Sequence, residues 1–310
     1  MKRPAWLIWL TNLPIHGFAR LVLWLVRVLP PRASFALGKG LALTAWWSMP
    51  RWRKTARRNL KLFFGDELTP RECARIGRAS AVHLGYYVIE FARMGFLPVD
   101  QALAMVVETE GVEHYEQALK QGRGVIGLAM HYGNWDLSGA YVTQRIRQLY
   151  AVGKLQRDRF FSDLAFPRRA RFGIKNIFAG KRANSAILKA LRENCVLGLL
   201  ADQNGGTTGT FAPFVGTPAS TVPGPAVLAL KTGAPLMVTF TRRIAPGKLK
   251  FIIKPPVDLS DLPEGKEARI IEVLARMNQA YEAVIREQPE QWLWGHKRWK
   301  TRPPGEKWLY

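Results

Sequence analysis

Cysteine is scarce in this chain of 310 residues, which contains only Cys73 and Cys195. Two cysteines exclude a disulfide scaffold and any multi-cysteine zinc or iron–sulfur site. The sequence also has no Gly-X-Y period, no heptad run and no internal repeat, which excludes fibres, coiled coils and solenoids. With 48% hydrophobic and 22% charged residues, the chain is typical of a folded protein that buries a sizeable core.

Acidic residues are also scarce in this chain. The chain has 46 Lys and Arg against 23 Asp and Glu, a net charge of +23, and its first acidic residue is Asp66. Together with 11 tryptophans, this excess indicates either nucleic acid or an anionic membrane surface as a partner. The basic residues before Asp66 stand between long runs of Leu, Trp and Val, whereas a nucleic-acid-binding arm would be basic and polar. The composition therefore favours a membrane over nucleic acid.

The apolar stretch over residues 5–29 is long enough for a membrane span, which needs about 20 mostly apolar residues. It is interrupted by Pro14, and Arg20 near its middle would be costly in hydrocarbon. We therefore expect a helix lying in the membrane plane rather than a span. An ordinary basic amphipathic helix packed on the domain remains an alternative. No clear cleavage site follows, so a signal peptide is not expected.

The remaining sequence alternates between helical and strand patterns. We predict a membrane-associating segment over residues 1–50, followed by an α/β domain over residues 51–310. Apolar runs predict strands at 124–130, 148–154, 195–202, 235–243 and 248–256, and three- to four-residue periodicity predicts helices near 67–96, 111–121, 134–146, 158–172, 185–192, 224–231 and 267–288. Residues 214–220 read as a small-residue loop. The alternation predicts an α/β fold with a mostly parallel central sheet flanked by helices.

The segment HYGNWD, from His131 to Asp136, carries the chemistry. His131 follows the buried strand 124–130 and would emerge at its carboxyl end. If the turn contains His131 and Asp136 begins a helix, the carboxylate can accept a hydrogen bond from the imidazole and raise the basicity of its other nitrogen. Because no Gly-x-Ser-x-Gly nucleophile motif is present, this pair suits a substrate hydroxyl as nucleophile. In the competing interpretation His131 caps a helix and Asp136 merely favours its first turn.

Three other segments have both a functional and a structural interpretation. The stretch 154–182 is strongly basic, which suits anion binding or a solvated helix face. Asp202 and Gln203 follow the apolar strand residues CVLGLLA, 195–201, and either position a substrate or form a turn. The tail alternates Trp with basic residues, a composition that suits either a membrane headgroup layer or core packing: Trp292, Trp294, His296, Lys297, Arg298 and Trp299.

A set of motifs resembles the bacterial lipid A biosynthesis acyltransferases of the late, lauroyl/myristoyl type, within the lysophospholipid acyltransferase superfamily. The matching pieces are RRNLKLFF, HYGNWD, RFG, ADQNGG, FVGTPASTVPGPAVLALKTGAPL and PEQWLWGHKRWKTRPPG, in this order along most of the chain. The resemblance implies a membrane-bound enzyme that moves a fatty acyl chain from a thioester to a hydroxyl of a glycolipid. One departure is Asp136, where many lipid A enzymes have Glu, although Asp is usual in the wider superfamily.

The resemblance also implies roles for single residues. His131 and Asp136 would form the catalytic dyad, and backbone N–H groups near Gly133 and Asn134 would stabilise the oxyanion. Arg171 in the RFG motif would contact glycolipid phosphate. Asp202 and Gln203 would position the substrate, and no cofactor or metal ion is expected.

The partners implied are acyl carrier protein as acyl donor, an anionic glycolipid as acceptor and the inner membrane, with the catalytic domain on its cytoplasmic face. Carrier proteins are strongly acidic, so a chain at +23 would attract them, as it would attract anionic lipid. Two alternatives stay open. One is an acyl-CoA-dependent lysophospholipid or mannolipid acyltransferase, and the other is a non-enzymatic basic protein that binds membrane or nucleic acid.

Overall fold

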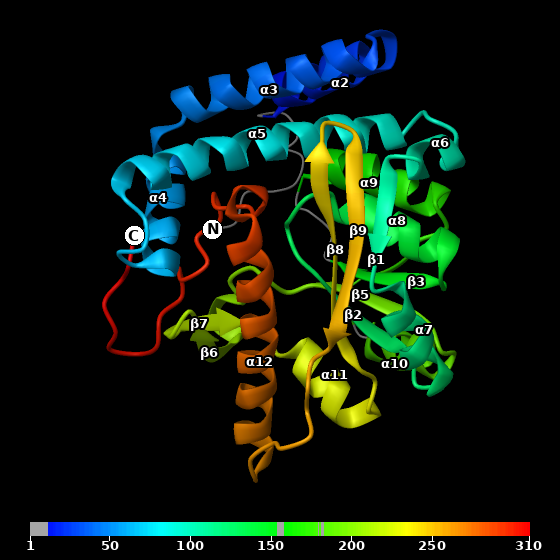
Figure 1. The fold of residues 1–310 in the computed structure, drawn as a ribbon, viewed down its shortest axis with the longest axis vertical. Helices are drawn as coiled ribbons and strands as arrows, with labels where there is room; N and C mark the ends of the chain where they lie inside the picture. Colours follow the sequence, from blue (N-terminus) through cyan, green and yellow to red (C-terminus); the bar gives the residue numbers. More distant parts are fainter. Residues whose placement is uncertain (1–11, 154–157, 179, 181–182) are drawn as a thin grey trace.

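The predicted α/β architecture is confirmed in the computed structural model, which describes residues 12–153, 158–178, 180 and 183–310. A central seven-stranded sheet has the strand order β1-β9-β8-β2-β5-β3-β4 (Figure 1). All neighbouring strands pair in parallel except β8 and β9, which form an antiparallel hairpin. The sheet strands are β1 (Val106–Glu110), β2 (Val125–Ala129), β3 (Leu149–Gly153), β4 (Lys175–Phe178), β5 (Val196–Leu200), β8 (Leu236–Ala245) and β9 (Lys248–Pro256).

Helices cover the sheet and extend beyond it. They are α2 (Leu13–Val28), α3 (Pro31–Ser48), α4 (Pro50–Phe64), α5 (Pro70–Met94), α6 (Val99–Leu103), α7 (Val112–Lys120), α8 (Trp135–Arg145), α9 (Arg159–Arg171), α10 (Ala183–Arg192), α11 (Gly224–Thr232) and α12 (Lys266–Glu287), with short 3₁₀ turns η1 (Gly206–Thr208) and η2 (Pro289–Gln291). The long helix α5 begins at a capping box in which Thr69 and Glu72 satisfy each other's backbone N–H groups. Pro70 follows at the first helical position, where it loses no hydrogen bond.

Alternate residues of the central strands enter two separate cores. Ile126 of β2 and Leu197 of β5 pack in the core shared with α4, α5 and α12. Their neighbours Val125 and Val196 point to the opposite face, into the core shared with α6, α7 and α8. A sheet buried on both faces explains why these strands read as continuous apolar runs.

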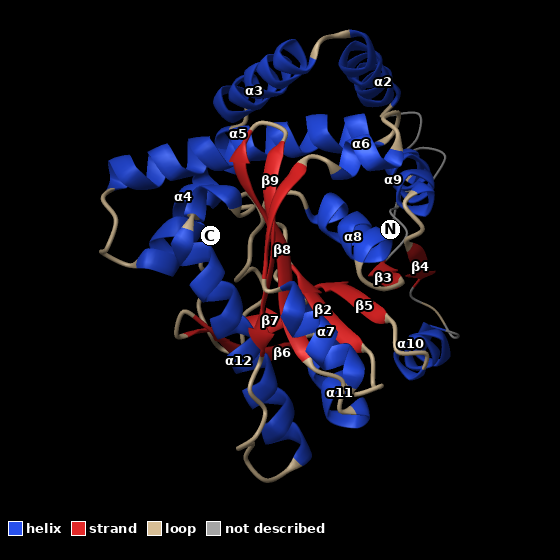
Figure 2. Cartoon of the chain, turned by 45° about the vertical axis from the view of Figure 1, so that its right-hand side comes forward, coloured by secondary structure: helices blue, strands red, loops and turns tan. Residues whose placement is uncertain are grey.

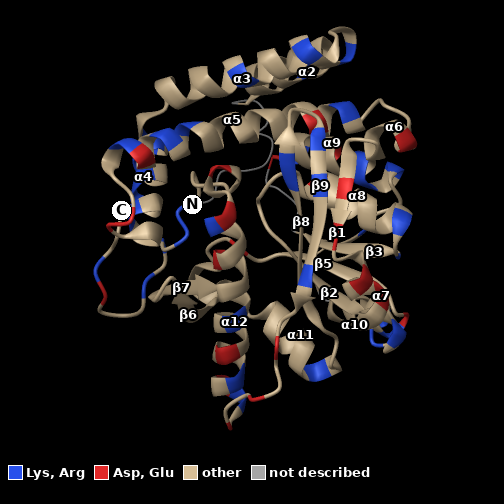
Figure 3. Ribbon diagram, in the orientation of Figure 1, with Lys and Arg blue, Asp and Glu red and all other residues tan. Residues whose placement is uncertain are grey.

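The N-terminal helices form an outer layer. Figures 1 and 2 both show α2 and α3 on the side of α5 that faces away from the sheet. Helices α3 and α5 approach so closely that a Cβ atom at Gly85 would lie 2.4 Å from the carbonyl oxygen of Gly38. Both outer helices carry Lys or Arg but no Asp or Glu (Figure 3). The predicted boundary at residue 50 falls where α3 passes into α4, and the division into two parts stays a prediction.

Helix α2 presents large apolar side chains to the outside. Its most exposed ones are Leu13, Ile15, Phe18, Leu21, Trp24 and Val28. In the described part of the chain, no helix combines the length and apolarity needed to cross a membrane. The predicted apolar segment starts at residue 5, and its first seven residues, 5–11, lie outside the described residues.

One predicted loop is wrong. Residues 214–220 belong to a second, two-stranded sheet formed by β6 (Thr210–Phe214) and β7 (Thr217–Thr221). The two strands are joined through Val215 and Gly216, both with positive φ angles, as the tightest hairpin turns require. Pro213 and Pro218 face each other across this hairpin. Proline is rare inside strands, which is why the sequence did not indicate a sheet here.

Candidate active site

His131 and Asp202 meet because their strands are neighbours. His131 follows β2 and Asp202 follows β5, and these strands pair in parallel with Ala129 opposite Leu200. The carboxyl ends of both strands therefore lie at the same edge of the sheet. There the imidazole Nδ1 of His131 lies 2.8 Å from Oδ1 of Asp202. The site is thus built from the two loops that the sequence places after predicted strands.

Asp202 is held in a nearly closed environment. Its side chain is 1% exposed, and its Oδ2 accepts hydrogen bonds of 2.8 Å from the backbone N–H of His131 and from the indole Nε1 of Trp292. Burial favours protonation, but the His131 imidazole and the surrounding N–H donors outweigh it and lower the pKa of Asp202 below its ordinary value. Asp202 is therefore an ionised, oriented acceptor for one nitrogen of His131.

Asp136 forms no hydrogen bond with His131, contrary to the expectation. It lies in the first turn of α8, as predicted, but its Oδ2 accepts from the Tyr87 hydroxyl at 2.7 Å and its Oδ1 from Arg169 Nε at 2.6 Å. The first turn of α8 directs this carboxylate toward α5 and α9, whereas strand pairing delivers Asp202 to the imidazole. Burial and the Asp136 charge raise the pKa of Tyr87 well above its ordinary value, and Asp136 also raises the pKa of Arg169.

The turn between β2 and α8 is shaped by Gly133 and Asn134. Gly133 has a φ of +58°, and a Cβ atom there would lie 1.7 Å from the carbonyl oxygen of Thr241. Its N–H donates to the carbonyl of Gln291 at 3.3 Å, and the N–H of Asn134 donates to Oγ1 of Thr241 at 2.9 Å. Both amides expected to face an oxyanion are thus engaged inside the protein. Their contacts fix the turn that carries His131.

A buried ion pair that the sequence did not reveal supports this turn. Glu90 of α5 and Arg243 of β8 are 0% and 1% exposed, and their side chains meet at 2.6 Å. Glu90 also accepts from the Asn134 amide at 3.1 Å, while Arg243 donates to the carbonyl of Gly133 at 3.3 Å. The pair therefore ties α5 and β8 to the His131 turn.

The tryptophan-rich tail closes the site from the other side. Trp292, Trp294 and Trp299 are 3%, 0% and 0% exposed, so the headgroup interpretation of this segment is wrong and the core interpretation is confirmed. The backbone N–H of Leu293 donates to the carbonyl of His131 at 3.0 Å. Composition alone could not separate the two interpretations, because aromatic and basic residues suit both environments.

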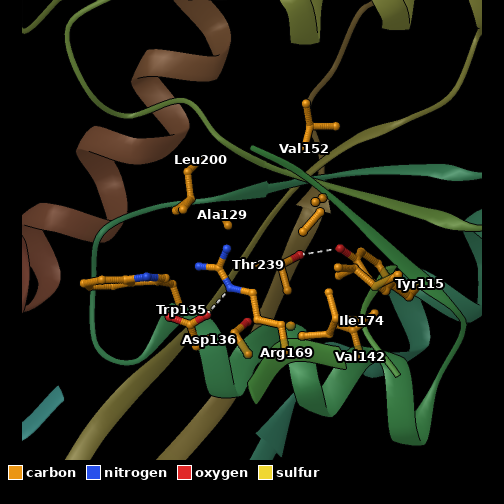
Figure 4. A pocket seen from close by; sticks show the side chains of 16 residues that line it. Tyr115, Ala129, Trp135, Asp136, Val142, Val152, Arg169, Ile174, Leu200 and Thr239 are labelled. Atoms are coloured by element: carbon orange, nitrogen blue, oxygen red, sulfur yellow. Dashed lines mark hydrogen bonds and ion pairs between the residues drawn. The ribbon is translucent and has the colours of Figure 1, made fainter. Parts of the chain in front are cut away.

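An apolar cavity lies between α8 and the sheet, next to Asp136 (Figure 4). Glycine or aliphatic residues from β2, β3, β5 and α8 make up most of its lining. Asp136 and Arg169 form its polar boundary, and a 2.6 Å hydrogen bond between Tyr115 and Thr239 lies at another part of its wall. Trp135 lines both this cavity and a small hollow beside His131. The polarity of this lining therefore suits a hydrocarbon chain, and Trp135 connects the cavity to the hollow beside the imidazole.

Residues 5–301 match the family model described as bacterial lipid A biosynthesis acyltransferase. The chain belongs to this family. It is 28% identical to the lipid A biosynthesis palmitoleoyltransferase of Escherichia coli K12 over 308 residues, covering 98% of this chain and 94% of that protein. It is 29% identical to the lipid A biosynthesis lauroyltransferase of the same organism, covering 96% and 93%. It is also 32% identical over 132 residues to a phosphatidylinositol mannoside acyltransferase of Mycobacterium tuberculosis, covering 42% of each chain. The resemblance stated from the motifs is thereby confirmed.

In this acyltransferase, Arg171 lies away from the cavity. Its guanidinium donates to the backbone carbonyl oxygens of Met94 and Leu97, at 3.3 and 2.7 Å, and so links α9 to the end of α5. The neighbouring Arg169 is the arginine at the site. Lys154, Arg157, Lys181 and Arg182 of the basic stretch lie outside the described residues.

Gln203 directly follows Asp202 and is half-buried. Its role in positioning the substrate stays a prediction. Within the described residues, no group of three or more His, Cys, Asp or Glu side chains is arranged to hold a metal ion. Both cysteines are buried, and burial is the main cause that raises the pKa of each thiol.

Proposed function

We propose that this acyltransferase transfers a fatty acyl chain from a thioester to a hydroxyl of an anionic lipid A-type glycolipid, with His131 as general base. The observation that carries this proposal is the contact of 2.8 Å between His131 Nδ1 and Asp202. With Nδ1–H donated to the carboxylate, Nε2 is the unprotonated nitrogen and accepts the proton of the acceptor hydroxyl.

The hydroxyl oxygen then attacks the thioester carbonyl carbon and forms a tetrahedral intermediate. When the intermediate collapses, the carbon–sulfur bond breaks, and the thiol leaves with the proton held by the imidazolium. The new ester bond remains on the glycolipid, and His131 returns to its neutral form. Asp202 stabilises the transient positive charge of the ring and stays ionised throughout.

Asp136 has a different role in this proposal from the one expected. Its ion pair with Arg169 forms the polar edge of the cavity in Figure 4, so Asp136 is a positioning residue at the donor site. The cavity accepts the donor's acyl chain, and the thioester lies at the indole of Trp135, whose ring centroid is 5.0 Å from that of His131. A chain seated there presents its carbonyl carbon to the imidazole.

Acyl carrier protein is the proposed donor. The support is electrostatic: a chain at +23 attracts an acidic protein over long range. The test is a comparison of the same acyl chain on carrier protein and on coenzyme A, with one phosphorylated glucosamine glycolipid as acceptor. We expect carrier-dependent transfer to fall steeply between about 0.05 and 0.5 M salt, because the Debye length shrinks from roughly 14 to 4 Å. Better use of acyl-CoA, with equal salt sensitivity for both donors, would contradict this assignment.

The acceptor has a rival. Similarity to a phosphatidylinositol mannoside acyltransferase over 42% of the chain favours a mannolipid as second candidate. The same assay decides between the two acceptors when it is run with a phosphorylated glucosamine glycolipid and with a phosphatidylinositol mannoside. Preference for the mannoside by an order of magnitude in kcat/KM would favour the rival.

We further propose that the enzyme works on the cytoplasmic face of the inner membrane and binds it through α2. The support is the row of exposed apolar side chains on α2, among them Phe18, Leu21 and Trp24, beside the basic residues Arg20 and Arg27. Replacing Phe18, Leu21 and Trp24 together by Ser should release the protein from vesicles of anionic phospholipid. The matched control replaces Val107, Val227 and Ile244, which are exposed elsewhere, by Ser. Equal retention of both variants would place the membrane contact on another surface.

A further inference from the structure

A second apolar compartment lies outside the cavity of Figure 4. It is a groove between the outer helices α2 and α3 and the helices α5 and α9, with a volume of about 530 Å³. Among its described lining residues, only Asp136 and Arg169 are charged. A groove of this size and polarity suits hydrocarbon rather than a sugar or a nucleotide.

The outer end of this groove is continuous with the exposed apolar surface. Four of its lining residues are themselves strongly exposed: Ile15 at 51%, Phe18 at 54%, Val88 at 43% and Phe161 at 42%. Ile15 and Phe18 belong to the apolar row along α2. The apolar lining of the groove is therefore continuous with the exposed apolar side chains of α2.

The inner end of the groove reaches the reaction site. Asp136 and Arg169 are the two residues that line both the groove and the cavity of Figure 4, so this ion pair separates the two compartments. Leu84 and Tyr87 line both the groove and the hollow beside His131. Two apolar compartments thus meet at one ion pair, and each shares lining residues with the hollow beside His131.

Positive charge flanks the groove. A neighbouring hollow is lined by Arg20, Arg159 and Asp163, which leaves it a net positive charge, and it shares Leu23 and Leu164 with the groove. Guanidinium groups at this position suit the phosphate of an anionic headgroup. The surroundings therefore match an anionic lipid better than a neutral one.

We propose that this groove binds a fatty chain already carried by the acceptor glycolipid, while the cavity behind Asp136 and Arg169 binds the donor's acyl chain. The inference rests on the proposed function, since transfer between two lipids requires two hydrocarbon chains to be bound at the same time. The ion pair keeps the two chains apart, and the acceptor hydroxyl reaches Nε2 of His131 past Tyr87 and Trp135.

Photo-crosslinking tests this placement directly. The wild-type protein is incubated with an N-acylated glucosamine phosphate whose acyl chain carries a diazirine, and separately with a diazirine-labelled acyl thioester. We expect the glycolipid chain to label α2, α3 and α9, and the thioester chain to label α8 and β3. Labelling of the same compartment by both probes would overturn the proposal.

A third arm uses a diazirine-labelled phosphatidylglycerol, which carries a similar chain on an ordinary membrane lipid. An unlabelled acceptor glycolipid should displace the acceptor probe from the groove, while unlabelled phosphatidylglycerol at the same concentration should not. If both lipids compete equally, the groove is a general lipid contact and the proposal is wrong. Because crosslinking needs no turnover, failure of transfer with every donor would contradict the proposed function alone.

A pair of substitutions on α3 provides the kinetic test. Ala45 lines the groove and is half-buried, whereas Ala36 on the same helix is exposed and does not line it. Ala45→Trp should raise KM for the acylated acceptor at least about tenfold, because two or more methylene groups lose their burial. It should leave KM for the donor and the KM for a deacylated acceptor unchanged, and Ala36→Trp should leave all three unchanged. Equal KM values for the acylated acceptor in wild type and Ala45→Trp would overturn the proposal.

Discussion

The imidazole Nδ1 of His131 lies 2.8 Å from the carboxylate of Asp202, a residue 71 positions later in the chain. The carboxylate five residues after His131 is instead held by Tyr87 and Arg169. The nearest acid in sequence is thus not the acid that orients the ring. Two buried carboxylates with different partners have different roles, and substitutions can separate them.

The first prediction concerns these two carboxylates. His131→Ala should lower kcat by at least roughly 10²–10⁴-fold, the usual worth of a general base. Asp202→Asn should lower kcat to a similar degree, because the amide no longer selects the productive tautomer of the imidazole. Steady-state kinetics with one donor and one acceptor measure both effects, and circular dichroism checks that the variants fold.

Asp136→Asn is the matched comparison. It leaves the contact between His131 and Asp202 intact but weakens the hold on Arg169, so we expect a higher KM for the donor and a smaller fall in kcat than in Asp202→Asn. The opposite order, with near-complete loss in Asp136→Asn and activity kept in Asp202→Asn, would return Asp136 to the role of orienting residue.

The second prediction concerns the buried pair behind the His131 turn. Glu90→Gln should lower the free energy of unfolding by about 3–5 kcal/mol, because it leaves the buried Arg243 without its counter-charge. Chemical denaturation measures this change. As a control, Glu67→Gln removes a carboxylate from the exposed pair with Arg286 and should change stability far less. Equal effects of the two substitutions would show that the Glu90 carboxylate does not support the fold.

Two histidines give a prediction about pH. Burial, assisted by the charge of Arg243, lowers the pKa of His83 to about 3, and burial lowers the pKa of His296 to about 4. Both values lie below the usual histidine pKa of about 6.5 in an unfolded chain, so the unfolded state binds more protons as the solution is acidified. Stability should therefore be greatest above about pH 6.5 and fall until the pH passes about 4 for His296 and about 3 for His83.

Thermal unfolding between pH 7 and pH 4.5 measures this slope. His83→Gln should reduce the fall in melting temperature with acidification, because glutamine binds no proton in either state. The comparison uses the slope of each variant rather than its melting temperature at one pH, so a uniform loss of packing does not affect it. An unchanged slope in His83→Gln would assign the acid sensitivity to other groups.

The sequence was informative where local patterns determine structure. The apolar runs predicted β2, β3, β5, β8 and β9, and the position of Asp202 after a strand marked it as a site candidate. The edge strand β1 was missed because four of its five residues are exposed and two are glutamate. The parallel pairing of β2 with β5 decides which acid meets His131, and that pairing depends on contacts between distant segments rather than on any pattern near residue 131.

The same limit explains the roles of Arg169 and Glu90. Tyr87 and Arg169 are 49 and 33 residues away from Asp136 in the sequence and lie on other helices. Local spacing therefore could not predict them as partners of Asp136. Glu90 looks like any acidic residue in a long helix, and only the packing of α5 against β8 makes it the buried partner of Arg243. The tryptophans of the tail were ambiguous for a related reason, because composition does not report burial.

The last prediction concerns the length of the transferred acyl chain. Ala151 of β3 lines the cavity of Figure 4, so a larger side chain there occupies space that the donor's chain would fill. Ala151→Leu adds three carbon atoms to the cavity wall. If each displaced methylene group loses about 0.8 kcal/mol of burial, kcat/KM for the longest accepted chain should fall by roughly 50-fold. Chains shorter by about three carbons should be used as well as by the wild type, since they leave the new side chain room. The measurement is a kcat/KM profile over a series of saturated acyl donors, with Ala268→Leu on the exposed surface of α12 as the control. A profile shifted by Ala151→Leu but not by Ala268→Leu supports the cavity as the site of the donor's chain, and an unshifted profile in a folded Ala151→Leu variant would contradict it.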